Sequence, residues 1–340
     1  MPYRVGVVGA SGYTGAELLR LLELHPALEP VVATSREFAG RPVSGVYPNL
    51  TTSLTYSELD AGELEGLDLA FLALPHGASM DIGAHLVKAG VRVVDLSADF
   101  RLKDPDAYPE WFGAAHTAPD SLGEWAYGIP ELHRAVIGDA AAVANPGCYP
   151  TAAILALAPL VRARLVDPSS IVISAASGVS GAGRGVNASV HFSHVDANFK
   201  AYGLPAHKHT PEIEQELSSL AGTNVVVTFV PHLVPMPRGL LATCIATLTR
   251  DDDPADAATE MYRDEPFVRV LVDTLPETKF THGSNLCLLG YRVDARAGRV
   301  IATAAIDNLG KGAAGQAIQN ANLMLGLDET SGLTAGGVYP

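Results

Sequence analysis

One cysteine occupies a position that would make its thiol reactive. Cys148 follows the turn Asn145–Gly147, and a long helical pattern over residues 151–166 begins directly after it. The free N–H groups and the dipole of a helix N-terminus stabilise a thiolate, so we expect a lowered thiol pKa and a nucleophilic sulfur. The same donors can hold an oxyanion on a carbon bonded to that sulfur. Pro146 and a positive φ at Gly147 would make the turn tight. The alternative is a cysteine that only fills the core.

Two histidines supply a candidate acid and base. His207 and His209 precede a helical pattern over residues 212–220, which we expect Thr210 to cap with Pro211 in the first turn. His209 would then lie just outside the helix, where the dipole disfavours the imidazolium. Two histidines can also bind a metal ion, but no third ligand follows at a suitable spacing, so we expect no metal. We predict an acid/base partner for Cys148.

Three arginines are candidates for binding an anion. Arg101 follows an apolar strand pattern, Arg184 ends a loop rich in glycine and serine over residues 177–183, and Arg238 precedes a later strand. Such a loop offers backbone N–H groups, and its arginine offers a cation, to a carboxylate or a phosphate. A flexible linker is the competing interpretation of the loop. The sequence leaves open which arginine binds which group.

The chain opens with a pattern typical of dinucleotide binding. A strand pattern over residues 4–8 runs into Gly9, Gly12 and Gly15, and a helical pattern follows. The spacing is G-x-x-G-x-x-G rather than the usual G-x-G-x-x-G. Strand, glycine turn and helix in this order let a diphosphate approach the backbone at the helix N-terminus. We therefore favour dinucleotide binding over a purely structural turn.

The end of the next strand pattern indicates which dinucleotide is bound. Residues 29–33 lead into Ser35 and Arg36, where an NAD-specific site would carry a carboxylate for the ribose hydroxyl. A hydroxyl and a guanidinium suit the 2′-phosphate of NADP instead. The alternative is that Arg36 only points into solvent.

Alternating strand and helix patterns continue through the first half of the chain. Strands at residues 67–74 and 91–96 flank a helix at 78–89, which predicts a doubly wound parallel sheet of Rossmann type. Ligands lie at the carboxyl ends of such strands, so we expect Pro75 and residues 97–101 to face the cofactor. We take His76 to be a spectator there.

The second half predicts a different fold class. Its strand patterns predict an α+β substrate and oligomerisation domain with an antiparallel sheet, and they cover residues 171–175, 224–230, 240–249, 286–293 and 299–306. Asn308 is expected to cap a last helix that packs back on the first domain. We expect domain boundaries at 1–147 with 308–340, and at 148–307. Residues 102–130 lack periodicity and are expected to form a long loop.

Composition limits the remaining possibilities. A chain of 340 residues exceeds the usual size of a single core, which favours two domains. A formal net charge of −14 argues against nucleic acid or an anionic membrane surface as a partner. Cys244 and Cys287 lie in apolar strand patterns, and we expect both in the core. We see no signal peptide and no membrane-spanning run, so we expect a cytoplasmic protein.

Taken together, these motifs resemble the N-acetyl-γ-glutamyl-phosphate reductase family of arginine biosynthesis, a relative of aspartate-semialdehyde dehydrogenase. The matching stretches are residues 9–15, 97–101, 145–151, 177–184, 207–212, 231–239 and 307–315. The resemblance implies NADPH-dependent reductive dephosphorylation of an acyl phosphate through a thioester on Cys148, with His209 as acid/base and His207 as the alternative. It also implies a homodimer or homotetramer built through the sheet of the second domain.

On these grounds we assign three sets of site residues. The catalytic set is Cys148, His209 and His207. The cofactor-binding set is Gly9, Ser11, Gly12, Tyr13, Thr14, Gly15, Ser35, Arg36, Pro75, Ser177, Gly178 and Asn308. The substrate-binding set is Arg101, Asn145, Gly181, Arg184 and Arg238.

Three other functions compete with this one. The nearest is the same chemistry on the one-carbon-longer N-acetyl-aminoadipyl phosphate of lysine biosynthesis, possibly bound to a carrier protein. A cysteine hydrolase without hydride transfer is the second, and the glycine turn argues against it. A non-catalytic NADP-binding regulator is the third, because a fold does not determine a function.

Overall fold

The computed structural model describes residues 1–339, which divide into two compact units. Unit 1 comprises Met1–Pro146 and Ala313–Thr334, and unit 2 comprises Gly147–Gly312 and the segment from Ala335 onward. Within the described residues, no helix has the length and apolar character needed to cross a membrane.

Unit 1 contains a parallel sheet of six strands in the order β2-β1-β3-β4-β6-β5. The strands are β1 (Tyr3–Val8), β2 (Leu28–Ala33), β3 (Leu69–Leu72), β4 (Arg92–Asp95), β5 (Trp125–Tyr127) and β6 (Ala142–Ala144). Every neighbouring pair is parallel, which confirms the predicted fold class of this half. The order reverses between β1 and β3, and such a reversal opens a crevice at the carboxyl ends of these strands.

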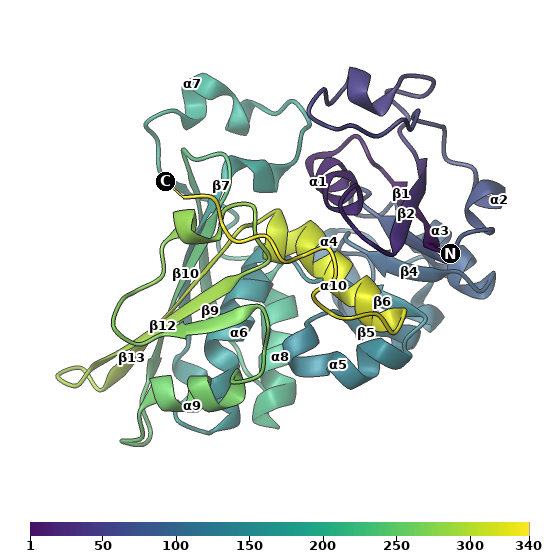
Figure 1. Cartoon of the computed structure of the whole chain (residues 1–340). Coiled ribbons are helices and arrows are strands. Elements are labelled where there is room, and N and C mark those ends of the chain that lie inside the picture. Colours follow the sequence, from purple (N-terminus) through teal and green to yellow (C-terminus); the bar gives the residue numbers. More distant parts are fainter. Residues whose placement is uncertain (340) are drawn as a thin grey trace. The chain divides into compact units, whose positions relative to one another are not determined.

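Helices accompany the sheet of unit 1 (Figure 1). They are α1 (Tyr13–Leu22), α2 (Ala61–Leu64), α3 (Met80–Lys88), α4 (Ala107–Phe112), α5 (Pro130–Asp139) and α10 (Gly315–Met324). All four residues of β3 are buried, as expected for a parallel strand covered on both faces. Helix α10 packs against α1, α5 and β4, so the predicted return of the last helix to the first part of the chain is confirmed.

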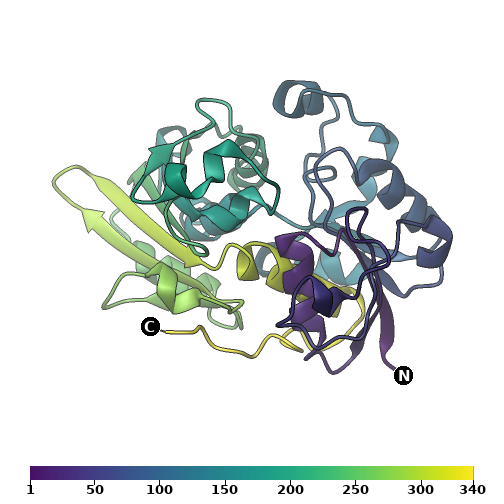
Figure 2. The same cartoon turned by 90° about the horizontal axis from the view of Figure 1, so that it is seen from above.

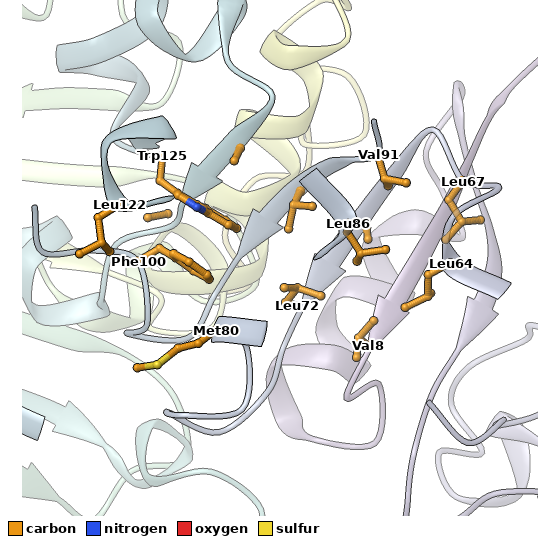
Figure 3. Packing of buried hydrophobic residues seen from close by; sticks show 14 of the residues in the cluster. Val8, Leu64, Leu67, Leu72, Met80, Leu86, Val91, Phe100, Leu122 and Trp125 are labelled. Atoms are coloured by element: carbon orange, nitrogen blue, oxygen red, sulfur yellow. The ribbon is translucent and has the colours of Figure 1, made fainter. Parts of the chain in front are cut away.

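The prediction of a long loop over residues 102–130 is wrong. This segment contains α4, a 3-10 helix at Pro119–Glu124 and the edge strand β5. The rings of Phe100 and Trp125 stack with centroids 3.7 Å apart, and both belong to the apolar core that includes Leu72 and Leu86 (Figure 3). These contacts join residues distant in sequence, so no local periodicity marks them.

Unit 2 contains a mixed sheet of seven strands in the order β11-β12-β13-β10-β7-β9-β8. The strands are β7 (Val172–Gly178), β8 (Lys200–Ala201), β9 (Thr228–Val234), β10 (Leu240–Thr247), β11 (Val268–Leu271), β12 (Cys287–Asp294) and β13 (Arg299–Ile306). The predicted antiparallel arrangement is wrong for two pairs, because β7 with β9 and β11 with β12 are parallel. The chain between β7 and β9 contains a helix, and such a crossover allows parallel pairing.

One face of this sheet is covered by helices (Figure 1). The helices of unit 2 are α6 (Cys148–Arg162), α7 (Phe192–Val195), α8 (Thr210–Ala221) and α9 (Pro254–Met261). Helix α6 packs on β10 and β13, and the alternate residues Ala242, Cys244 and Ala246 are fully buried. Their neighbours Leu241 and Ile245 are only half-buried. The hairpin of β12 and β13 extends beyond the helices (Figure 2). Cys287 is also fully buried, so both core cysteines were predicted correctly.

Candidate active site

Two glycines shape the turn between β1 and α1. Gly9 has φ +81°, and a Cβ there would lie 2.5 Å from the carbonyl oxygen of Ala73. A Cβ on Gly15 would lie 2.6 Å from the carbonyl oxygen of Gly9, so helix and turn approach too closely for any side chain. Gly12 is the N-cap residue of α1, and because it has no side chain it makes no capping hydrogen bond to the first turn. The first turn of α1, which begins with Tyr13 and Thr14, therefore has no side-chain cap from Gly12, and N–H groups of such a turn are suited to binding an anion.

The end of β2 is joined to this turn by hydroxyl groups. The Oγ atoms of Ser11 and Ser35 are 2.8 Å apart, and Gly9 N donates to Thr34 Oγ1 at 3.1 Å. Ser35 is buried, whereas the side chain of Arg36 is exposed. The structure thus places a hydroxyl and an exposed guanidinium beside the glycine turn.

The other candidates of unit 1 differ in accessibility. Pro75 is exposed three residues after the end of β3. Arg101 is buried, and its Nη2 donates to the carbonyl oxygen of Leu96 at 2.9 Å. Asn145 is fully buried, its Oδ1 accepting from Asn320 Nδ2 at 3.0 Å and its Nδ2 donating to Ala313 O at 3.3 Å. Asn145 therefore fastens the segment after β6 to the helix α10.

In unit 2, Cys148 is the first residue of the fifteen-residue helix α6. The helix begins three residues earlier than predicted, and the cysteine is half-buried while Gly147 and Tyr149 are buried. The expectation of a positive φ at Gly147 is wrong, because its φ is −70°. Gly147 N donates to Glu212 Oε1 at 2.8 Å, so a carboxylate from another helix holds this turn.

The segment that ends the Gly147–Gly312 stretch of unit 2 packs against the cysteine through Gly312. Gly310–Ala314 forms a π-helix, in which Gly312 N donates to Asp307 O at 3.0 Å. A Cβ on Gly312 would lie 2.8 Å from Cys148 Cβ. Only a glycine at this position leaves Cys148 where it is.

The two histidines differ in their hydrogen bonds. Helix α8 begins at Thr210 with His209 as its N-cap residue, so the predicted cap at Thr210 is wrong by one position. His209 N donates to His207 Nδ1 at 3.2 Å, which requires that nitrogen of His207 to be unprotonated. Burial lowers the pKa of His207 to about 4, and Lys208 adds to the effect.

Aromatic side chains surround these histidines. The ring of Tyr149 lies 5.8 Å from that of His207 and 5.9 Å from that of His209, measured between centroids. Tyr202 donates its hydroxyl to Tyr149 Oη at 3.2 Å, and burial raises the pKa of Tyr202 to about 12, with Cys148 adding to the shift. Both neighbours of Cys148 thus contact the start of α8, Gly147 through Glu212 and Tyr149 through His209.

The loop rich in glycine and serine is tied to two other segments. A Cβ on Gly178 would lie 2.7 Å from Met236 O. Asn308 Nδ2 donates to Ser180 Oγ at 2.8 Å, and Asn308 Oδ1 accepts from Gly239 N at 2.8 Å. The prediction that Asn308 caps the last helix is therefore wrong, since its side chain bridges two loops. These contacts argue against the interpretation of the loop as a flexible linker. Within the same loop, Gly181 is exposed and Arg184 is half-buried.

Arg238 is engaged by a buried carboxylate. Its Nε lies 3.1 Å from Asp307 Oδ1 and 3.0 Å from Asp307 Oδ2. Asp307 also accepts from Leu309 N at 2.9 Å, Gly310 N at 3.2 Å and Gly283 N at 2.6 Å. Asp307, rather than Asn308, receives the N–H groups at the start of the π-helix.

The structure places the predicted residues in two groups. Unit 1 brings together the glycine turn, Ser35 and Arg36, and unit 2 brings together Cys148 and the two histidines. The sequence analysis missed Glu212, Tyr149, Tyr202, Asp307 and Gly312. Glu212 had a detectable signal, since it is an acid in the first turn after the histidines, whereas the contact of Gly312 has none. No group of histidine, cysteine or acidic residues within the described part of the chain could hold a metal ion.

Comparison with known proteins identifies similar sequences. The NAD binding domain of semialdehyde dehydrogenases matches residues 4–140, and the semialdehyde dehydrogenase dimerisation domain matches residues 148–308. The N-acetyl-gamma-glutamyl-phosphate reductase of Symbiobacterium thermophilum is 53% identical over 348 residues, with 100% of each chain covered. The protein of that name from Pelotomaculum thermopropionicum is 50% identical over 347 residues, again with 100% of each chain covered.

Solved structures share the fold. Aspartate semialdehyde dehydrogenase II of Vibrio cholerae, complexed with ASA, has a TM-score of 0.74 at 18% identity, with 96% of this chain and 98% of that chain covered. Aspartate semialdehyde dehydrogenase with NADP from Candida albicans has a TM-score of 0.71 at 17% identity, with 96% and 99% covered.

Proposed function

This chain belongs to the N-acetyl-gamma-glutamyl-phosphate reductase family, and on that premise we propose that it reduces N-acetyl-γ-glutamyl phosphate to N-acetylglutamate 5-semialdehyde with NADPH, releasing phosphate. The reaction is a step of arginine biosynthesis. The observation that carries the proposal is the half-buried Cys148 at the start of a fifteen-residue helix, beside helix α8, whose N-cap residue is His209. Relatives named for the glutamyl compound favour it over the aminoadipyl compound.

Cys148 is the nucleophile. The N-terminus of α6 stabilises its thiolate, which attacks the acyl carbon while phosphate departs, leaving a thioester. A thioester is less stabilised by resonance than a carboxylate, so its carbon accepts a hydride more readily. Bound NADPH supplies that hydride. The carbon–sulfur bond then breaks, and the aldehyde and the thiolate separate.

His209 moves the proton. It protonates the oxyanion that forms when the hydride adds, and it takes the proton back as the carbon–sulfur bond breaks. Two observations support His209 over His207. His207 Nδ1 accepts the backbone N–H of His209, and burial holds the pKa of His207 near 4, so His207 stays neutral and keeps His209 in place.

The cofactor is NADP(H), and its main binding element is the glycine turn of unit 1. The fit rests on the cradle formed by Gly9 and Gly15, where a Cβ would collide with backbone, and on the open N-cap at Gly12. Ser35 and the exposed Arg36 suit a 2′-phosphate. Besides these residues, the proposed contacts of the cofactor are those of Ser11, Tyr13, Thr14, Pro75, Ser177, Gly178 and Asn308.

The substrate is bound by Arg101, Asn145, Gly181, Arg184 and Arg238. Asp307 holds the Nε edge of Arg238 and so orients its guanidinium, which favours a fixed, planar contact with a carboxylate or a phosphate.

Unit 1 serves as the NADP-binding domain and unit 2 as the catalytic and oligomerisation domain. The chain forms a homodimer, or a homotetramer made of two such dimers, through the face of the unit 2 sheet opposite helix α6. The net charge of −14 favours small-molecule partners over nucleic acid or membrane. The reaction takes place in the cytoplasm.

The test follows the reverse reaction. The protein is incubated with N-acetylglutamate semialdehyde, phosphate and NADP, and absorbance of the reduced nicotinamide is recorded before and after thiol alkylation. Cys148→Ser should lower kcat by at least about a thousandfold, while NADP still binds. Cys244→Ala, in the core of β10, is the matched control and should stay active. Phosphate-dependent activity that survives in Cys148→Ser refutes the proposal.

A further inference from the structure

A single buried carboxylate holds the loop between β3 and α3. Asp99 is fully buried. Its Oδ1 accepts from Gly77 N at 2.7 Å and its Oδ2 from Ser79 N at 2.8 Å. Asp99 Oδ1 also lies 2.5 Å from His76 Nδ1. Three residues of one short loop thus converge on one side chain.

Asp99 is itself held in place by other segments. Its carbonyl oxygen accepts from Tyr108 Oη at 2.7 Å and from His116 Nε2 at 2.7 Å. Its N–H donates to Ser97 Oγ at 3.0 Å. These bonds fix the backbone of Asp99 independently of the loop, so the carboxylate can serve as an anchor for it.

The charge of Asp99 suits this role. Burial alone would raise the pKa of this carboxyl, but the donors of His76, Gly77 and Ser79 together lower it below its ordinary value. Asp99 is therefore ionised at neutral pH, and hydrogen bonds to an ionised acceptor are stronger than those to a neutral one.

The anchored loop lies where a dinucleotide binds in this kind of sheet. Strand order reverses between β1 and β3, so the loops that follow these two strands line the crevice. The two loops touch, since a Cβ on Gly9 would collide with Ala73 at the end of β3. Pro75 is exposed on the anchored loop, and Gly77 has φ +83°, which most other residues would resist.

We propose that Asp99 is a positioning residue for the nicotinamide cofactor. The carboxylate of Asp99 holds residues 75–79 in the conformation that binds NADP(H). This inference rests on the proposed function. Asp99 contacts neither substrate nor cofactor, and acts through the backbone of the loop.

The test measures cofactor binding apart from chemistry. In a fluorescence titration, Asp99→Asn should raise the Kd for NADPH about tenfold or more. The amide keeps one accepting oxygen but loses the negative charge, and its NH2 group faces a backbone N–H of the loop that then has no acceptor. The KM for NADPH should rise, whereas the KM for the acyl phosphate and the rate of Cys148 alkylation should not change. Glu131→Gln, a buried carboxylate on α5, is the matched control and should leave the Kd unchanged.

A second variant keeps the test decisive if Asp99→Asn does not fold. His76→Phe removes the Nδ1 donor but keeps a ring against Phe112, whose centroid lies 4.3 Å from that of His76. It should raise the Kd for NADPH, and where both variants fold, their effects should be less than additive. A Kd unchanged in Asp99→Asn, or in His76→Phe if only that variant folds, overturns the inference. Failure of the wild-type protein to bind NADPH refutes the proposed function instead.

Discussion

At the scale of single residues, two histidines two positions apart have different environments. His207 is buried among the rings of Tyr149, Tyr202 and Phe229, and its Nδ1 accepts a backbone N–H. His209 is the N-cap residue of α8, and its backbone is held by His207. The same residue type therefore supplies a support in one case and, by our proposal, a proton in the other.

Substitution should separate these two roles. His209→Asn should lower kcat by about a hundredfold to ten-thousandfold, the usual contribution of a general acid/base. His207→Asn should cost less than about tenfold in kcat, because an asparagine oxygen can still accept the N–H of His209. Steady-state rates at saturating NADPH measure both. A larger loss in His207→Asn would reverse the assignment.

Acid should destabilise the folded protein through His207. An unfolded histidine takes up its proton near pH 6.5, but burial and Lys208 delay this to about pH 4 in the folded chain. Between these values the unfolded chain binds the additional proton, so the free energy of unfolding falls as pH drops from 6.5 to 4. The contribution is on the order of 3 kcal/mol.

Urea unfolding at pH 7 and at pH 4.5 measures this effect. His207→Asn should show a smaller fall in unfolding free energy than the wild-type protein between these two pH values. An equal fall in both proteins would mean that His207 does not carry the effect.

At the scale of elements, two helix starts and one π-helix position the cysteine. Glu212 from α8 receives the N–H of Gly147, and Gly312 from the π-helix lies against Cys148 Cβ. The π-helix is in turn held by Asp307 at its start. The sulfur is therefore located by three segments that are remote from one another in sequence.

Gly312→Ala should displace the cysteine. Its methyl group would lie 2.8 Å from Cys148 Cβ, so α6 or the π-helix must shift, at a cost of about 1–3 kcal/mol in stability. We expect a lower kcat and a changed rate of Cys148 alkylation, with an unchanged Kd for NADPH. Gly336→Ala, where a Cβ meets no atom within 4 Å, is the control. An unaltered alkylation rate in Gly312→Ala would show that the contact does not set the position of the sulfur.

At the scale of the whole molecule, the sheet of unit 2 has one face turned away from helix α6. Residues of β10 alternate between full burial beneath α6 and partial exposure at Leu241 and Ile245. The dimerisation domain of semialdehyde dehydrogenases matches this part of the chain. Apolar side chains that stay partly exposed on a sheet face are typical of a subunit interface.

Ile245→Lys should therefore weaken subunit association, because the interface would have to bury an ammonium group. Light scattering should show a lower mass than that of the wild-type protein at the same concentration. Val136→Lys, at a side chain that is 60% exposed on α5, is the control and should leave the mass unchanged. If Ile245→Lys keeps the full mass, the interface lies elsewhere.

Local patterns were sufficient to predict most elements. The strand, glycine turn and helix at the start of the chain are confirmed, and β13 has the predicted bounds. The predictions were wrong where contacts between distant residues decide the structure. Residues 102–130 are ordered by contacts such as the stacking of Trp125 on Phe100. In the sheet of unit 2, two strand pairs are parallel instead of antiparallel. The prediction of a positive φ at Gly147 was wrong. The turn is held by the hydrogen bond from Gly147 N to Glu212, which forms at a negative φ.

By itself, the sequence predicted which residues would carry the chemistry, because a helix start beside a cysteine and a glycine turn beside a strand are properties of neighbouring residues. Only the tertiary structure decided that His207 accepts the backbone N–H of His209 and that Asn308 bridges two loops. The same holds for the contacts that Asp99, Glu212 and Gly312 make with the segments of the candidate site. Those roles depend on burial and on hydrogen bonds between residues far apart in the chain, and no local pattern encodes them.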